Sequence, residues 1–166
     1  RLTFLTSTAI LGTLGQTPLI THELAHAWTG NLVTNATWQD FWLNEGWTTY
    51  AETRISEVLE GRDTTDLNAA FHAHEIMKAM ERLGMDSPQT CLKQAEAVEA
   101  DSSAFTIPYH KGCFFLQACE RAVGRVRFDA FIQGYMKRFQ FQSITTETFL
   151  DFMKAELPDV FAKVNV

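Results

Sequence analysis

His22-Glu23-Leu24-Ala25-His26 is the stretch that decides the fold and the chemistry of this chain. Residues four apart on a helix lie one above the other, so the imidazoles of His22 and His26 can point at one ion. Glu23 is rotated off that pair by one residue of a helix with about 3.6 residues per turn. It is too displaced to be a natural ligand but well placed to reach a water beside the metal. The spacing therefore predicts a helix with a zinc-binding face.

A third protein ligand has to come from elsewhere in the sequence, and Glu45 in Asn44-Glu45-Gly46 is the best candidate. Two histidines and one glutamate leave the fourth tetrahedral position open, which is typical of a catalytic zinc site. Zinc lowers the pKa of its water to about 7, and Glu23 can then act as the general base. We therefore expect His22, His26 and Glu45 to hold one Zn²⁺ ion.

The residues around both motifs resemble a known family. Residues 22–34 read HELAHAWTGNLVT and residues 41–46 read FWLNEG. Both segments are similar to the gluzincin aminopeptidases, the group that contains aminopeptidase N and leukotriene hydrolase. Thermolysin also carries H-E-x-x-H and a downstream glutamate, but its second motif differs. The resemblance implies the helical part of a thermolysin-like catalytic domain, mainly α-helical with a short N-terminal β segment.

A further candidate lies in the segment Ile107-Pro108-Tyr109-His110-Lys111-Gly112. Hydrolysis of a peptide passes through an oxyanion, and a phenol is a suitable neutral hydrogen-bond donor to it. A tyrosine in a loop is by itself more often structural. However, Pro-Tyr-x-Lys-Gly resembles the family segment that carries its transition-state tyrosine. The resemblance therefore implies that Tyr109 stabilises the oxyanion, and it implies no role for His110.

The resemblance implies a zinc metallopeptidase that removes N-terminal residues from peptide substrates. Two alternatives stay open. Leukotriene hydrolase has another active-site tyrosine a few residues earlier, linked to its lipid epoxide chemistry. Ala104 stands at that place here, which argues against a bifunctional epoxide hydrolase. The second alternative is a non-catalytic zinc-binding interaction domain, but a degraded site would be expected to have lost Glu23 or a ligand.

The composition suits a single globular domain over residues 1–166, with 46% hydrophobic and 20% charged residues. A net charge of −6 argues against a nucleic-acid partner. No stretch approaches the roughly 18–20 apolar residues of a membrane span. Cys91, Cys113 and Cys119 are odd in number and lack C-x-x-C spacing, so they predict free thiols and a reducing, cytoplasmic location.

Local signals predict a short strand at residues 2–6 and then a run of helices. Thr17 and Pro18 mark the start of the first helix, and Gly30-Asn31 marks its end. His72 and His74 are two residues apart on a later helix, so they point to different sides and both are expected at the surface. The other expected helices cover residues 44–60, 66–83, 91–100, 113–123, 128–139 and 146–156.

By comparison with the family, the chain is expected to be a fragment of a longer parent. Family members carry a Gly-x-Met-Glu-Asn segment just before a strand like that expected at residues 2–6. The glutamate of that segment binds the free amino group of the substrate, and the segment is not in this sequence. A flanking N-terminal β domain and a C-terminal helical domain are the other expected partners. Because correct positioning supplies about 7–11 kcal/mol of barrier lowering, we expect the fragment to bind zinc with little or no aminopeptidase activity.

Overall fold

The computed structural model describes residues 2–10, 12, 14–94 and 103–164. Helices dominate it, which confirms the mainly helical fold class. The α-helices are α1 (Thr17–Ala25), α2 (Trp42–Glu60), α3 (Arg62–Leu83), α4 (Gly112–Val123), α5 (Arg125–Phe139), α6 (Thr146–Glu156) and α7 (Val160–Lys163). Short 3-10 helices are η1 (Ser7–Ala9), η2 (Leu14–Gln16), η3 (Trp38–Asp40), η4 (Pro88–Thr90) and η5 (Ser103–Phe105), and η6 (Ile107–Lys111) is a π-helix. The strands are β1 (Val33–Asn35) and β2 (Gln142–Ile144).

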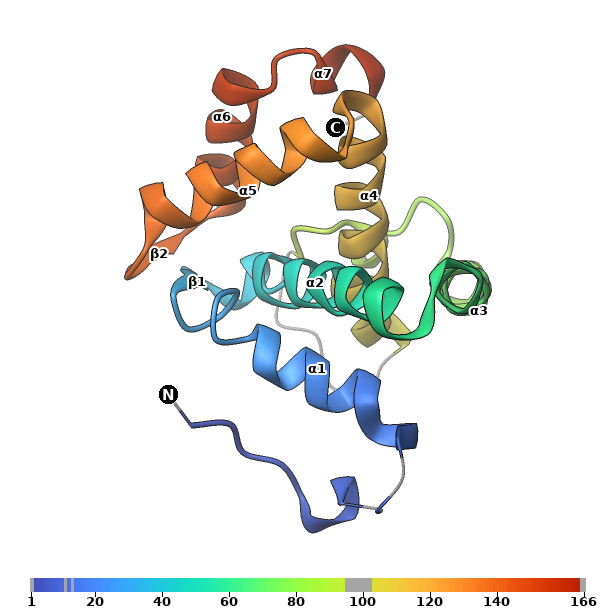
Figure 1. The fold of residues 1–166 in the computed structure, drawn as a ribbon. Coiled ribbons are helices and arrows are strands. Elements are labelled where there is room, and N and C mark those ends of the chain that lie inside the picture. Colours follow the sequence, from blue (N-terminus) through green and yellow to red (C-terminus); the bar gives the residue numbers. More distant parts are fainter. Residues whose placement is uncertain (1, 11, 13, 95–102, 165–166) are drawn as a thin grey trace.

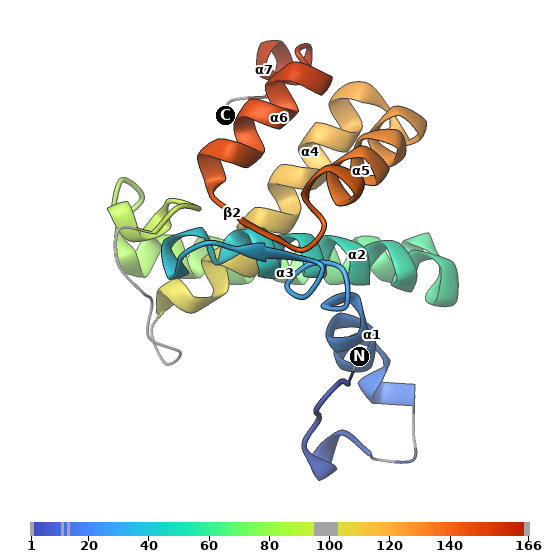
Figure 2. The same cartoon turned by 90° about the vertical axis from the view of Figure 1, so that its left-hand side faces the viewer.

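Helix α2 is the element around which the others are arranged. It crosses the middle of the molecule, with α1 on one side and α5, α6 and α7 on the other (Figure 1). The view turned by 90° shows α1 and the N-terminal segment below α2, and α4, α5 and α6 above it (Figure 2). The helix ends at Gly61, whose φ of 88° is a conformation that suits glycine. Helix α2 thus has one face toward α1 and another toward α5 and α6.

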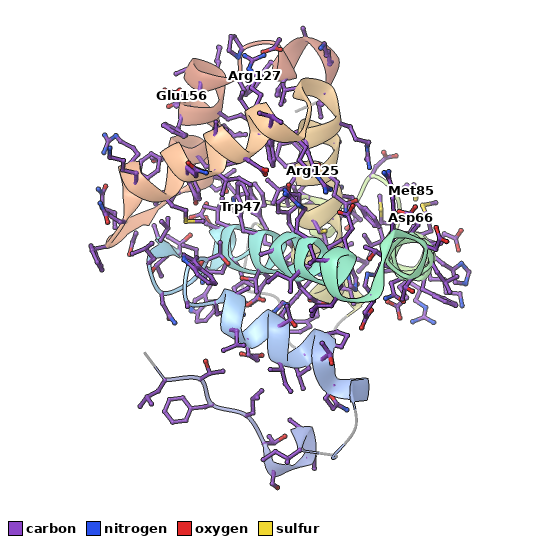
Figure 3. All side chains as sticks on the ribbon, viewed as in Figure 1. Trp47, Asp66, Met85, Arg125, Arg127 and Glu156 are labelled. Carbon is purple, nitrogen blue, oxygen red and sulfur yellow. The ribbon has the colours of Figure 1, made fainter. Side chains whose placement is uncertain are left out.

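The upper face of α2 is buried in an aromatic core. Trp47 lies between α2 and α5 (Figure 3), where its ring stacks on Tyr135 with centroids 5.3 Å apart. Phe128, Phe131 and Phe149 belong to the same cluster, and all are buried. Phe131, Tyr135 and Phe139, which recur at helical spacing on α5, thus pack in the core. Each such ring buries about 150–250 Å², so this core fixes α2 against α5 and α6 and leaves its lower face toward α1.

Two long-range polar contacts tie the first third of the chain to its end. Strands β1 and β2 pair in parallel, with Val33 opposite Gln142. Asp40 is 1% exposed, and its Oδ1 accepts hydrogen bonds of 2.8 Å from both the backbone N–H and the hydroxyl of Thr146 at the start of α6. Buried polar groups of this kind need such partners. The contacts fix the position of η3 just ahead of Glu45.

Several expected boundaries differ from the structure. The strand expected at residues 2–6 is wrong: these residues form no regular element, and Leu2 and Phe4 are 81% and 84% exposed. A strand needs a neighbour for its backbone hydrogen bonds, and no described residue pairs with this run. Helix α3 begins at Arg62, earlier than expected. Most of the helical piece expected at 91–100 lies outside the described residues. No helix within the described ranges is long and apolar enough to cross a membrane.

Candidate metal and active site

Helix α1 carries the two histidines of the H-E-x-x-H motif on one face. The helix ends at Ala25, earlier than the predicted Gly30-Asn31. His26 still has helical backbone angles, and its N–H donates to the carbonyl of His22 at 3.2 Å. The four-residue spacing therefore holds, and the ring centroids lie 4.9 Å apart with an interplanar angle of 85°. The two imidazoles can face one ion, as the spacing predicts.

Glu45 approaches both imidazoles from the first turn of α2. Its Oε2 lies 3.1 Å from Nε2 of His22 and 3.4 Å from Nε2 of His26. Glu45 is only 7% exposed. One ligand atom from each of the three residues lies within 4.8 Å of the others. Two imidazole nitrogens and one carboxylate oxygen are donors that suit zinc, so the side chains fit such an ion.

The electrostatics of the site follow from its two carboxylates, Glu45 and Glu52. Burial alone lowers the pKa of His22, but hydrogen bonds to Glu45 and Glu52 raise it to about 9. Both ring nitrogens of His22 face carboxylate oxygens, which can only accept hydrogen bonds, so this arrangement favours the charged imidazolium over the neutral ring. In turn, the pKa of Glu45 is lowered: its burial is outweighed by the hydrogen bonds from His22 and His26. The charged residues thus hold one another in place.

The outer nitrogen of each histidine also has a partner. Nδ1 of His22 donates to Oε2 of Glu52 at 3.0 Å, and Nδ1 of His26 donates to the carbonyl of Thr29 at 2.8 Å. The hydroxyl of Thr48 lies 3.1 Å from the same Nδ1. Such contacts fix ring orientation in metal sites. From the sequence, Glu52 is equally compatible with this role and with a place at the surface, and neither threonine is indicated. The available signal was the helical spacing of positions 45, 48 and 52 on α2.

Tyr109 lies on η6, a π-helix that continues into α4, and not on the loop that the sequence suggested. Short π-helical turns are frequent at functional sites. The ring stacks beside His22 with centroids 6.0 Å apart. Burial raises the pKa of Tyr109, and the charges of Glu45 and Glu23 raise it further. The structure thus places Tyr109 beside His22, where the charges of both Glu45 and Glu23 act on its hydroxyl.

These features define a helical domain in which two imidazoles and a carboxylate converge beside a further carboxylate and a phenol. Residues 8–165 match the Peptidase family M1 domain. The chain belongs to peptidase family M1.

Three relatives illustrate this membership. The chain is 37% identical to leucine aminopeptidase 2 of Yarrowia lipolytica over 91% of its own length and 24% of that protein. Its fold is similar to native leukotriene A4 hydrolase of Saccharomyces cerevisiae, with a TM-score of 0.85 and 35% identity over 98% of this chain and 27% of the other. The fold is also similar to a mutant M1 zinc metallopeptidase of Deinococcus radiodurans bound to a tripeptide substrate. The TM-score is 0.68, and the identity is 29% over 90% of this chain and 33% of the other. The chain thus spans about a quarter of the length of the curated relatives that it matches.

Proposed function

We propose that this chain is the helical part of the catalytic domain of a zinc aminopeptidase, which hydrolyses N-terminal residues of peptides. The observation that carries the proposal is the convergence of His22, His26 and Glu45 in a member of family M1. Residues 1–166 are then one partial thermolysin-like domain, and the domains that flank it belong to a longer parent. The length of the relatives supports this view.

The chain's own residues fit a single zinc ion. His22 and His26 offer their Nε2 atoms and Glu45 offers a carboxylate oxygen. When bound, zinc supplies a Lewis acid that polarises the substrate carbonyl and lowers the pKa of water. Glu52 and Thr29 hold the two imidazoles through Nδ1, so that Nε2 of each ring is directed toward Glu45.

Glu23 and Tyr109 supply the remaining groups. The Glu23 carboxylate takes a proton from the attacking water and then delivers it to the leaving amine nitrogen. The Tyr109 hydroxyl donates a hydrogen bond to the carbonyl oxygen as that oxygen becomes negative. Because the pKa of Tyr109 is raised, the hydroxyl keeps its proton at neutral pH and stays a donor.

The lipid epoxide hydrolase alternative receives less support. One similar structure is a leukotriene A4 hydrolase, but Ala104 is fully buried beside η6 and carries no hydroxyl. It offers no phenol for a second reaction. The aminopeptidase activity needs the groups that this chain provides and, elsewhere in the parent, a group that recognises the free amino group of the substrate.

Cys91, Cys113 and Cys119 are free thiols, which supports a cytoplasmic location.

Glu23→Gln in the full-length protein tests the proposal. We expect hydrolysis of an amino-acid anilide to fall at least about 100-fold, because general-base catalysis contributes about 10²–10⁴-fold. Zinc content, measured by mass spectrometry, should stay at the wild-type level. Glu60→Gln is the matched control, since Glu60 is an exposed glutamate at the far end of α2. A wild-type protein that binds zinc but hydrolyses no peptide or anilide would instead indicate the non-catalytic interaction domain.

A further inference from the structure

A second cluster of metal-ligating side chains lies between α3 and η6. The rings of His72 and His110 stack with centroids 4.1 Å apart and an interplanar angle of 19°. The Oε2 of Glu75 lies 3.6 Å from Nε2 of His110. One ligand atom from each of the three residues lies within 4.8 Å of the others. This geometry corrects the expectation for His72, which is half-buried against His110, whereas His74 is exposed as predicted.

The donor set of this cluster suits a transition metal, and one of the two stacked rings has to turn for both in-plane nitrogen lone pairs to point at one ion. His72 and Glu75 are three residues apart on α3, so they share one face of that helix. His110 approaches the same face from a segment far along the chain. Two imidazoles and one carboxylate are donors that bind zinc and other first-row divalent ions. The side chain of Glu75 is 60% exposed and that of His110 is 16% exposed, so an ion can enter from the solvent side.

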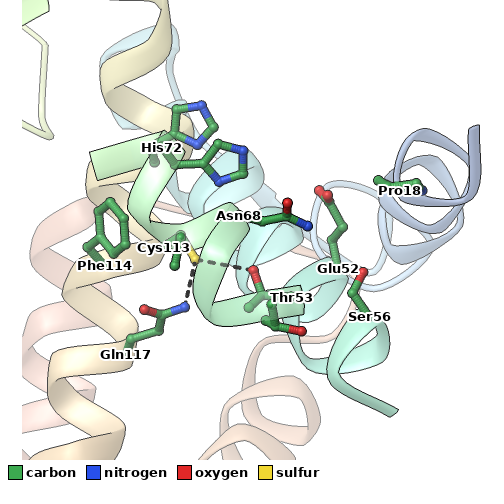
Figure 4. Close-up of a pocket in the computed structure, with 12 residues that line it drawn as sticks. Pro18, Glu52, Thr53, Ser56, Asn68, His72, Cys113, Phe114 and Gln117 are labelled. Carbon is green, nitrogen blue, oxygen red and sulfur yellow. Dashed lines mark hydrogen bonds between the residues drawn. The ribbon is translucent and has the colours of Figure 1, made fainter. Parts of the chain in front are cut away.

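A small cavity adjoins the two rings. His72 and His110 line a space of about 30 Å³ between α1, α2, α3 and α4, which is room for one small ion or a water molecule. Figure 4 shows His72 and Glu52 on the wall of this same cavity. Nδ1 of His110 is buried and has no hydrogen-bond partner among the described residues. A buried polar atom without a partner is costly. A water molecule in this cavity would provide a partner for Nδ1, and Nε2, which faces Glu75, is the nitrogen left for an ion.

We propose that His72, Glu75 and His110 form a second site for a first-row divalent metal ion, distinct from that of His22, His26 and Glu45. The inference goes beyond the proposed peptidase activity and does not depend on it. An ion bound here ties α3 to η6, the segment that carries Tyr109. Two of its three ligands, His72 and His110, also line the cavity that Glu52 lines, and Glu52 holds His22.

The number of zinc ions that each full-length chain binds tests this site. The protein is first stripped of metal and then loaded with zinc. After equilibrium dialysis against Zn²⁺, mass spectrometry should find one zinc ion fewer per chain in His72→Ala than in the wild type. Glu75→Gln should lose the same ion, and because Glu75 is exposed this variant keeps the proposal testable if His72→Ala does not fold. The matched control is His74→Ala, which removes an exposed histidine from the same helix and should retain every ion.

The outcomes separate this proposal from that of the peptidase site. Loss of one ion in Glu45→Gln and of another in His72→Ala supports both sites. If Glu45→Gln loses an ion but His72→Ala and Glu75→Gln do not, the second site is overturned and the first stands. If His74→Ala loses as many ions as His72→Ala, the binding is a general property of surface histidines, and the second site is again overturned. The second ion should also raise the melting temperature of the wild type and not of His72→Ala.

Discussion

Gly46 and Gly112 meet backbone to backbone: a Cβ built on Gly46 would lie 2.9 Å from the Cα of Gly112, and one built on Gly112 would lie 2.8 Å from the Cα of Gly46. Real Cβ atoms do not approach other atoms so closely. Glu45 directly precedes the first glycine, and Tyr109 lies three residues before the second. The absence of both side chains lets α2 and the start of α4 touch, and this contact brings Glu45 and Tyr109 to one place.

Gly46→Ala should therefore destabilise the protein. An added methyl group must push two backbones apart, and overpacking of this kind costs about 1–3 kcal/mol. We expect a lower melting temperature of the full-length protein and a lower kcat, because Tyr109 moves away from Glu45. Gly134→Ala on α5 is the control: its Cβ would meet only Phe152, at 3.8 Å. That variant should be as stable as the wild type or slightly more so. Equal melting temperatures for all three proteins would contradict the prediction.

Glu52→Gln should weaken zinc binding without removing a ligand. The carboxylate accepts from Nδ1 of His22 at 3.0 Å and so fixes the direction of its Nε2. Loss of such an outer partner typically lowers metal affinity about 10–100-fold. Competition with a chelator of known affinity measures the effect, and Glu60→Gln on the same helix serves as the control. An unchanged affinity in Glu52→Gln would mean that packing alone orients His22.

The affinity for zinc should depend strongly on pH. In the metal-free protein, burial lowers the pKa of His22, but the hydrogen bonds to Glu45 and Glu52 raise it to about 9 from its ordinary value of 6.5. At least one proton must leave when a metal binds, so the apparent affinity should rise by about tenfold or more per pH unit between pH 6.5 and 9. Chelator competition at several pH values checks this, and an affinity that levels off near pH 7 would contradict it.

The same shift predicts how the stability of the metal-free protein changes with pH. The pKa of His22 is raised in the folded state, so its charged form contributes stability that is fully present below pH 6.5. That contribution is lost as the pH rises through about 9. Thermal unfolding of the metal-free protein at pH 6.5 and pH 9 measures the loss. Glu52→Gln should show a smaller loss, because one of the two carboxylates that hold the charge is gone.

Tyr109→Phe should separate catalysis from structure. The phenyl ring can keep its place beside His22, with centroids 6.0 Å apart, but the donor to the oxyanion is lost. Removal of one such donor costs about 10²–10³ in kcat, while zinc content should not change. Tyr50→Phe is the control, because its hydroxyl donates to Glu120 on α4, which is not one of the candidate site residues. It should lower stability and leave kcat within a few-fold of the wild type.

Much of the helical arrangement could be predicted from local sequence. The helix ends at Gly61 and Gly84, the start of α1 at Thr17-Pro18 and the helical spacing of the aromatic residues on α5 all follow from short-range rules. The strand at residues 2–6 was wrong because its existence depends on a partner that no local pattern reveals. The π-helix at Tyr109 was also missed, since one extra residue per turn leaves no clear periodic signal.

The sequence by itself determined the pair His22 and His26, because four-residue spacing on a helix fixes their relation without any tertiary contact. Glu45 was expected from its motif, but only the folded chain brings its carboxylate within 3.4 Å of both rings. The role of Glu52 and the pairing of His72 with His110 were decided by tertiary structure alone. Those contacts join residues 30 or more positions apart, and such distances are set by how helices pack and not by the period of any one helix.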